Sequence, residues 1–80
     1  MKLYLLSQDD NNNYDTYDSI VVCAENEDDA KTITPHGTPF KENEAYTSWA
    51  RSAPSISCKE IGTANEGEER GVILASFNAG

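Results

Sequence analysis

Four short apolar runs, separated by polar stretches, set the pattern of hydrophobic and polar positions along the chain. They are Lys2–Leu6, Tyr17–Glu25, Ser55–Thr63 and Val72–Phe77. Short apolar runs rich in β-branched residues predict strands. The second and fourth runs are nearly continuous in apolar residues, so we expect them to be central strands buried on both faces. The polar stretch between the first two runs predicts a long hairpin.

The third run breaks its own alternation. Ile56 and Cys58 would share one side of a strand, whereas Ile61 falls out of step with them. An extra residue in a strand shifts the following side chains to the other face. We therefore predict a bulge near Lys59 and Glu60 that turns Ile61 inward.

A helix is predicted between the second and third strands. Asn26 is a candidate N-cap, and Asp29 lies three residues later, as in a loose capping box. Acidic side chains crowd the first turn, where the helix dipole favours negative charge. Pro35 would push the preceding residue out of the helical region. We predict a helix over Glu27–Ile33 that needs the sheet beneath it to be stable.

The segment 35–55 follows no clear period. It holds all three prolines of the chain together with three aromatic residues. So long an irregular connection is unusual in a small domain. We predict a helical turn around Asn43–Ala50, with Tyr46 and Trp49 on one face, covering an end of the core.

The resulting order of elements is strand, strand, helix, irregular segment, strand, strand. This order predicts one domain over residues 1–80 of the α+β class: a small, four-stranded, mainly antiparallel sheet with one short helix on one face (β-β-α-β-β).

Composition adds a strong acidic bias. The 80 residues carry a net charge of -8, and Leu, Ile, Val and Phe together number 14. That places the chain near the border with disorder, but the ordered apolar pattern argues for a fold. Phosphate backbones and anionic lipids would repel such a chain, so we expect no direct contact with nucleic acid or membrane. No signal peptide or long apolar run is evident, and we expect a cytoplasmic protein, in the host cytoplasm if it is phage-borne.

Familiar catalytic and metal-binding patterns are missing. Counting an EF-hand loop from Asp9 puts Tyr14 in the glycine position and Ile20 in the glutamate position, so calcium ligation fails. The only histidine, His36, has no nucleophile placed beside it by a known motif. We predict no enzyme activity, no cofactor and no metal. Cys23 and the other cysteine are expected to be reduced.

The acids gather near the start of the chain. Eight of them lie between residues 3 and 30, a span without lysine or arginine. One interpretation is that these charges keep the protein soluble. A more specific interpretation is that they form a surface that binds a lysine- and arginine-rich groove of a partner, with a tyrosine as an anchoring contact. The candidate partner-binding residues are Asp9, Asp10, Tyr14, Asp15, Asp18, Glu27, Asp28 and Asp29.

Three stretches resemble small acidic proteins carried by phages and prophages: MKLYLLSQD, YDTYDSIVVCAENEDDA and GVILASFNAG. That resemblance implies an anti-defence accessory protein, such as an anti-CRISPR or a DNA mimic. We therefore expect a non-enzymatic inhibitor that occupies a basic, nucleic-acid-binding surface of a host protein. The alternatives are a small-ligand or metal-binding module using the 9–18 loop, an enzyme centred on His36 with Cys23 or Cys58, and a soluble domain of another role.

Overall fold

The computed structural model describes residues 1–11, 15–42 and 47–78, and the side chains of these up to Ser76. Its elements in chain order are β1 (Lys2–Ser7), β2 (Thr16–Ala24), α1 (Glu27–Ala30), the 3-10 helix η1 (Ala53–Ser55), β3 (Ser57–Thr63) and β4 (Gly71–Asn78). The predicted β-β-α-β-β order and the four-stranded antiparallel sheet are confirmed. No helix in these described ranges has the length and apolar character needed to cross a bilayer.

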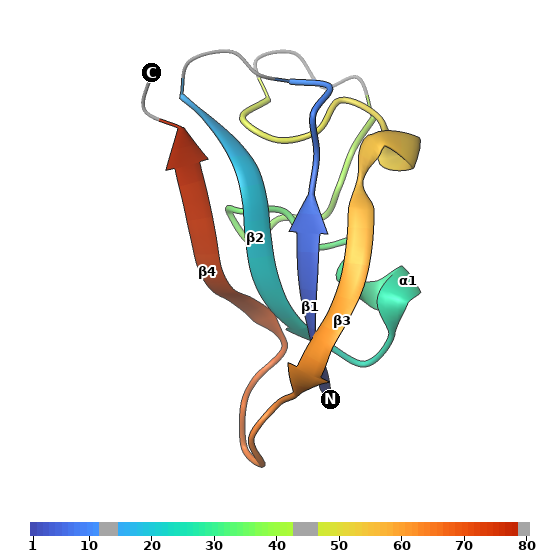
Figure 1. Cartoon of the computed structure of the whole chain (residues 1–80), viewed down its shortest axis with the longest axis vertical. Coiled ribbons are helices and arrows are strands. Elements are labelled where there is room, and N and C mark those ends of the chain that lie inside the picture. Colours follow the sequence, from blue (N-terminus) through green and yellow to red (C-terminus); the bar gives the residue numbers. More distant parts are fainter. Residues whose placement is uncertain (12–14, 43–46, 79–80) are drawn as a thin grey trace.

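The sheet has the order β3-β1-β2-β4, and every neighbouring pair is antiparallel (Figure 1). The β1–β2 hairpin forms the centre, and the β3–β4 connection passes from one edge of the sheet to the other. β2 is central as predicted, but the prediction of a central β4 is wrong. Val72 and Ala75 of β4 pack against the core, while Leu74, on the other face, is 67% exposed.

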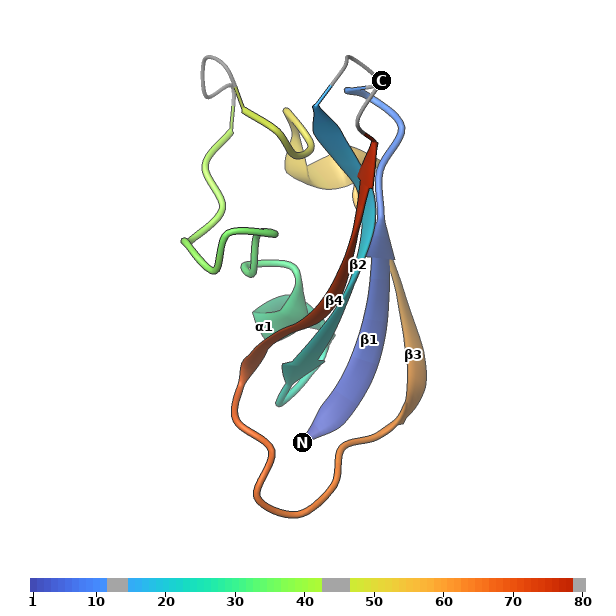
Figure 2. The ribbon, with the colours of Figure 1, turned by 90° about the vertical axis from the view of Figure 1, so that its left-hand side faces the viewer.

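The core lies on one face of the sheet. Leu6 of β1 and Ile20 and Val22 of β2 point to this face, where α1 and the chain between α1 and β3 cover them (Figure 2). Trp49, from the irregular segment, is buried against the same cluster, as expected of a core plug. The opposite face, here called the open face, is covered by no helix or strand of the described residues (Figure 2).

The helix is shorter than predicted. Asn26 is the N-cap, and its side-chain oxygen accepts a hydrogen bond of 2.8 Å from the backbone N–H of Asp29. The helix ends at Ala30, before Pro35 can act, and the chain tightens into a turn. Ile33 then bridges Pro39, an extended pairing that a helical Ile33 could not make.

The predicted helical turn over Asn43–Ala50 is wrong for its described part. Residues 47–50 are not helical, and Tyr46, with the rest of 43–46, lies outside the described residues. A single helical turn forms later, at η1, which has Pro54 in its first turn. Proline suits that position because its missing N–H has no partner to lose there.

A bulge does interrupt β3, but Ile61 is not turned inward. Tyr4 of β1 pairs with Glu60, and Leu3 pairs with Gly62, so Ile61 is the extra residue. Its side chain is 48% exposed. The bulge therefore lies one residue later than predicted and moves Ile61 out of the packed rows.

Candidate functional site

Four of the predicted contact residues lie at one end of the sheet, where β1 ends and β2 begins; this region is here called the loop end. Asp9 and Asp10 follow β1, while Asp15 and Asp18 stand at the entry to β2. Three of the four are exposed, and Asp10 is half-buried. Tyr14, the predicted aromatic anchor, lies outside the described residues.

Asp10 is an internal anchor of the loop end. Its carboxylate accepts hydrogen bonds from the backbone N–H of Arg51 (3.0 Å) and Ser52 (3.1 Å) and from the hydroxyl of Ser55 (2.8 Å). Desolvation raises the pKa of Asp10, but these hydrogen bonds together outweigh it and hold the pKa below its ordinary value. The carboxylate is thus occupied by the chain's own donors, which makes it a poor contact for a partner.

Two buried amides hold the same loop. Gln8 Nε2 donates to the carbonyls of Asn11 (3.0 Å) and Tyr17 (2.7 Å), and Gln8 Oε1 accepts from the backbone N–H of Asn11. Asn11 Nδ2 donates in turn to the carbonyls of Thr47 (3.0 Å) and Trp49 (2.9 Å). Sequence reasoning missed both residues, because in a polar run nothing distinguishes a buried amide from a solvated one. They fix the loop end to the core.

The helix acids are partly neutralised. Arg70 forms an ion pair with Asp29: its Nη2 lies 2.8 Å and its Nε 2.9 Å from Oδ1 of the carboxylate. Arg70 also donates a hydrogen bond of 3.0 Å to the hydroxyl of Thr32. The hydrogen bond between Arg70 and Asp29 is the main cause that lowers the pKa of Asp29. Glu27 pairs with Lys31 at 3.4 Å, one helical turn later. Of the three predicted helix residues, Asp28 alone forms no ion pair with a described residue.

The seven predicted residues that the structure describes do not share one surface. The hairpin pairs Ser7 with Ser19 at the loop end and Lys2 with Ala24 at the end near α1. Five residue steps at about 3.4 Å each separate these two pairs by about 17 Å. The loop-end acids and the helix acids are therefore two groups at opposite ends of the sheet.

A row of four serines crosses the open face beside the loop end. Ser57, Ser7, Ser19 and Ser76 are paired in register across β3, β1, β2 and β4. They occupy the face opposite Leu6, because side chains alternate along a strand. Their spacing in the sequence gave no hint of this row, since it depends on strand order and register.

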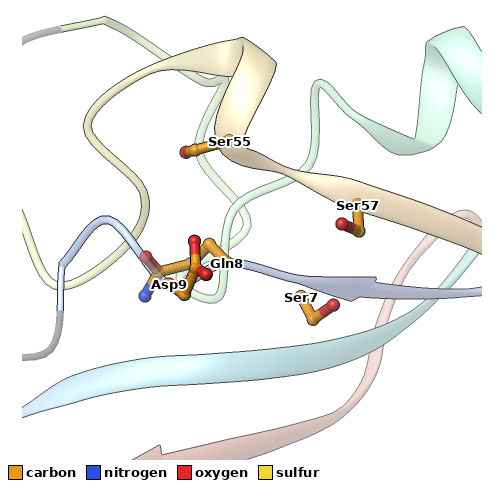
Figure 3. A pocket seen from close by; sticks show the side chains of 5 residues that line it. All are labelled: Ser7, Gln8, Asp9, Ser55 and Ser57. Carbon is orange, nitrogen blue, oxygen red and sulfur yellow. The ribbon is translucent and has the colours of Figure 1, made fainter.

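A shallow hollow of about 260 Å³ opens at one end of this row. Five polar residues line it: Ser7, Gln8, Asp9, Ser55 and Ser57 (Figure 3). Hydroxyls and a carboxylate dominate this lining, so it suits a polar or cationic group and not an apolar one.

His36 has a partner that the sequence did not reveal. Its Nε2 lies 2.8 Å from the hydroxyl of Ser48, and its ring meets the Tyr17 ring edge-on, with centroids 5.5 Å apart. A serine nucleophile also needs its histidine oriented by a third group, so this pair alone does not make a catalytic site. Within the described residues, neither Cys23 nor Cys58 is hydrogen-bonded to His36.

Neither the residues described nor the comparisons point to a bound group. In the ranges 1–11, 15–42 and 47–78, no three His, Cys, Asp or Glu side chains gather closely enough to hold a metal. Comparisons of the chain with protein-family models, curated proteins and solved structures found no match. The candidate site is therefore the loop end, argued from its own geometry.

Proposed function

We propose that the chain is a non-enzymatic acidic interaction protein, of the phage anti-defence type, that occupies a basic surface on another protein. The preferred partner surface is one that otherwise binds nucleic acid. Lysines and arginines placed to meet phosphates would meet carboxylates equally well.

The observation that carries this proposal is the contrast between the two acidic groups. Asp29 and Glu27 are matched by cations of the chain, whereas Asp15 and Asp18 form no ion pair with a described residue. Both aspartates are exposed. Unmatched charge on a fixed support produces a lasting negative potential that speeds encounter with a basic partner.

The support beneath that charge is ordered. Gln8 ties the chain after β1 to the carbonyl of Tyr17 in β2, while Asn11 and Asp10 tie it to Trp49 and Ser55. Trp49 is buried in the core. A contact surface that is already ordered loses less conformational entropy on binding. The loop end therefore fits a binding role better than a solubility role, which needs charge but no fixed geometry.

The test begins by finding the partner. The immobilised chain would be used to capture proteins from host lysate at low salt, and each captured protein would be identified and purified. We expect proteins that bind nucleic acid, that are released by salt, and that DNA or RNA displaces. Salt-resistant capture, or simultaneous binding of partner and nucleic acid, would overturn the proposal.

A matched pair of variants then locates the contact. Asp15 has a positive φ of 62°, which asparagine tolerates and lysine does not favour. The test variant is therefore Asp15→Asn with Asp18→Lys. The control, Glu68→Lys with Glu69→Gln, changes the net charge equally at the far end of the sheet. We expect the association rate to fall about tenfold for the test variant and far less for the control. Equal rates for both would place the contact elsewhere.

A further inference from the structure

The outer edge of β4 pairs with no other strand of the described chain. β4 is the last strand of the sheet, and among the described strands β2 alone lies beside it. No further backbone hydrogen bond joins Gly71–Asn78 to the rest of the described chain. Along this edge, alternate backbone N–H and C=O groups therefore face outward, and such a row is complementary to another extended strand.

The two edges of the sheet differ in their protection. β3 carries Lys59 and Glu60, and charges of this kind oppose pairing with another chain. β4 reads GVILASFN and has no charge and no proline. Its Ile73 and Leu74 are 49% and 67% exposed. An edge with these properties favours association.

Regular pairing is possible over most of β4. The register shift between Val21 and Val22 of β2 leaves Ile73 as a bulge. From Leu74 to Asn78 β4 contains no further bulge. The second register shift between β2 and β4 comes from an extra residue of β2, Asp18. About five residues at the end of β4 can thus add a regular antiparallel ladder.

We propose that β4 pairs antiparallel with β4 of a second copy, about a two-fold axis, to form a continuous eight-stranded sheet. A strand paired with itself in this way is self-complementary, as a two-fold interface requires. Since β4 carries no charge, the pairing brings no like charges directly opposite each other. In a two-fold ladder over Leu74–Asn78, Leu74 lies opposite Asn78 of the second copy, so the second copy presents no charge to this uncharged edge.

Leu74 gives the pairing an apolar contact as well. On the open face, Leu5, Val21 and Leu74 lie in one row with Lys59 across the four strands. Leu74 ends this row at the free edge, which explains its high exposure. A second β4 alongside would cover part of the exposed Leu74 side chain and remove that apolar surface from water.

Salt separates this self-association from the proposed binding of a basic partner. Each copy carries a net charge of -8, so salt that screens repulsion should strengthen the dimer. The same salt should weaken attraction to a basic surface. Either proposal can therefore fail while the other stands.

Sedimentation velocity over a range of protein concentrations, at low and high salt, tests the dimer. We expect reversible dimers that are favoured by salt. Leu74→Lys and Ile73→Lys should each weaken dimerisation about tenfold or more. Ile61→Lys is the control, because it adds the same charge at a bulge of similar exposure on the opposite edge. A monomer at every concentration and salt, or equal loss in the control, would overturn the proposal.

Hydrogen exchange of the parent chain provides a readout that does not depend on any variant. Amides of Leu74–Asn78 should gain protection as concentration rises, while the amides of β3 should not. Protection that is independent of concentration, or that grows on β3 instead, would contradict pairing through β4.

Discussion

The carboxylate of Asp10 accepts a hydrogen bond of 2.8 Å from the hydroxyl of Ser55, 45 positions later in the chain. The same carboxylate receives the backbone N–H of Ser52, the N-cap residue of η1. One aspartate thus fixes the chain after β1 to the turn that leads into β3. This link holds Asp10 against residues 51–55 and shows why an acid in a polar run need not be a contact residue.

Replacing Asp10 with asparagine tests that structural role. The amide keeps the shape, but each carboxylate oxygen of Asp10 faces a backbone N–H, so an NH₂ group in place of either oxygen loses at least one hydrogen bond. We expect the free energy of unfolding to fall by about 1–3 kcal/mol, measured by urea denaturation. Asp18→Asn, on the exposed surface of the same end, is the control and should change stability by less than about 0.5 kcal/mol. Equal effects would show that Asp10 is not an anchor.

Acid should destabilise the fold through Asp10 and Asp29. Hydrogen bonds lower the pKa of both carboxyls in the folded state. A group with a lowered folded pKa contributes stability that is complete above its unfolded pKa, about 3.9, and is lost as pH falls through the folded value. Stability should therefore drop below about pH 4. The drop should be shallower in Asp10→Asn and in Asp29→Asn, as denaturant midpoints across pH would show; an unchanged slope in both would contradict it.

Local pattern was enough to predict most of the fold. Apolar runs located all four strands within about two residues, and Asn26 marked the start of the helix. The errors arose where tertiary contacts, and not the local sequence, determine the structure. Val72–Phe77 looks like a central strand because it is apolar throughout, yet nothing in a single sequence shows that one face of the sheet stays uncovered. Ile33 fits a helical face but pairs with Pro39 instead.

The candidate site was less accessible from sequence. Charge counts treat Asp10, Asp18 and Asp29 alike. In the structure, however, the Asp10 carboxylate accepts hydrogen bonds from donors of the chain, and the Asp29 carboxylate is paired with Arg70. These partners lie some 40 residues away along the chain, so no local pattern predicts them. The serine row and the His36–Ser48 pair depend in the same way on register and loop path.

The buried amide of Asn11 should matter more than any exposed acid. Asn11→Ala removes two hydrogen bonds and leaves the carbonyls of Thr47 and Trp49 without these donors. We expect a loss of about 2–3 kcal/mol in unfolding free energy, and a change in Trp49 fluorescence in the folded state. Asn65→Ala, in the exposed β3–β4 connection, is the matched control. A loss no greater than that of the control would show that the network does not hold the loop end.

The two cysteines should stay reduced and differ in reactivity. Cys23 pairs with Leu3 and Cys58 with Leu6. These β1 partners are three positions apart, an odd number, so the two cysteines lie on opposite faces of the sheet, and neither forms a disulfide.

Cys23 is buried, whereas Cys58 is half-buried, and desolvation raises the pKa of the Cys58 thiol. Because the thiolate is the reactive form, Cys58 should label more slowly than a free thiol at neutral pH and should speed up as pH rises. Cys23 should react only when the protein unfolds, and Cys58→Ser should therefore remove the native-state reaction. Mass spectrometry of alkylated protein would check this; rapid labelling of Cys23 in the folded chain, or an intramolecular disulfide, would contradict the arrangement of the sheet.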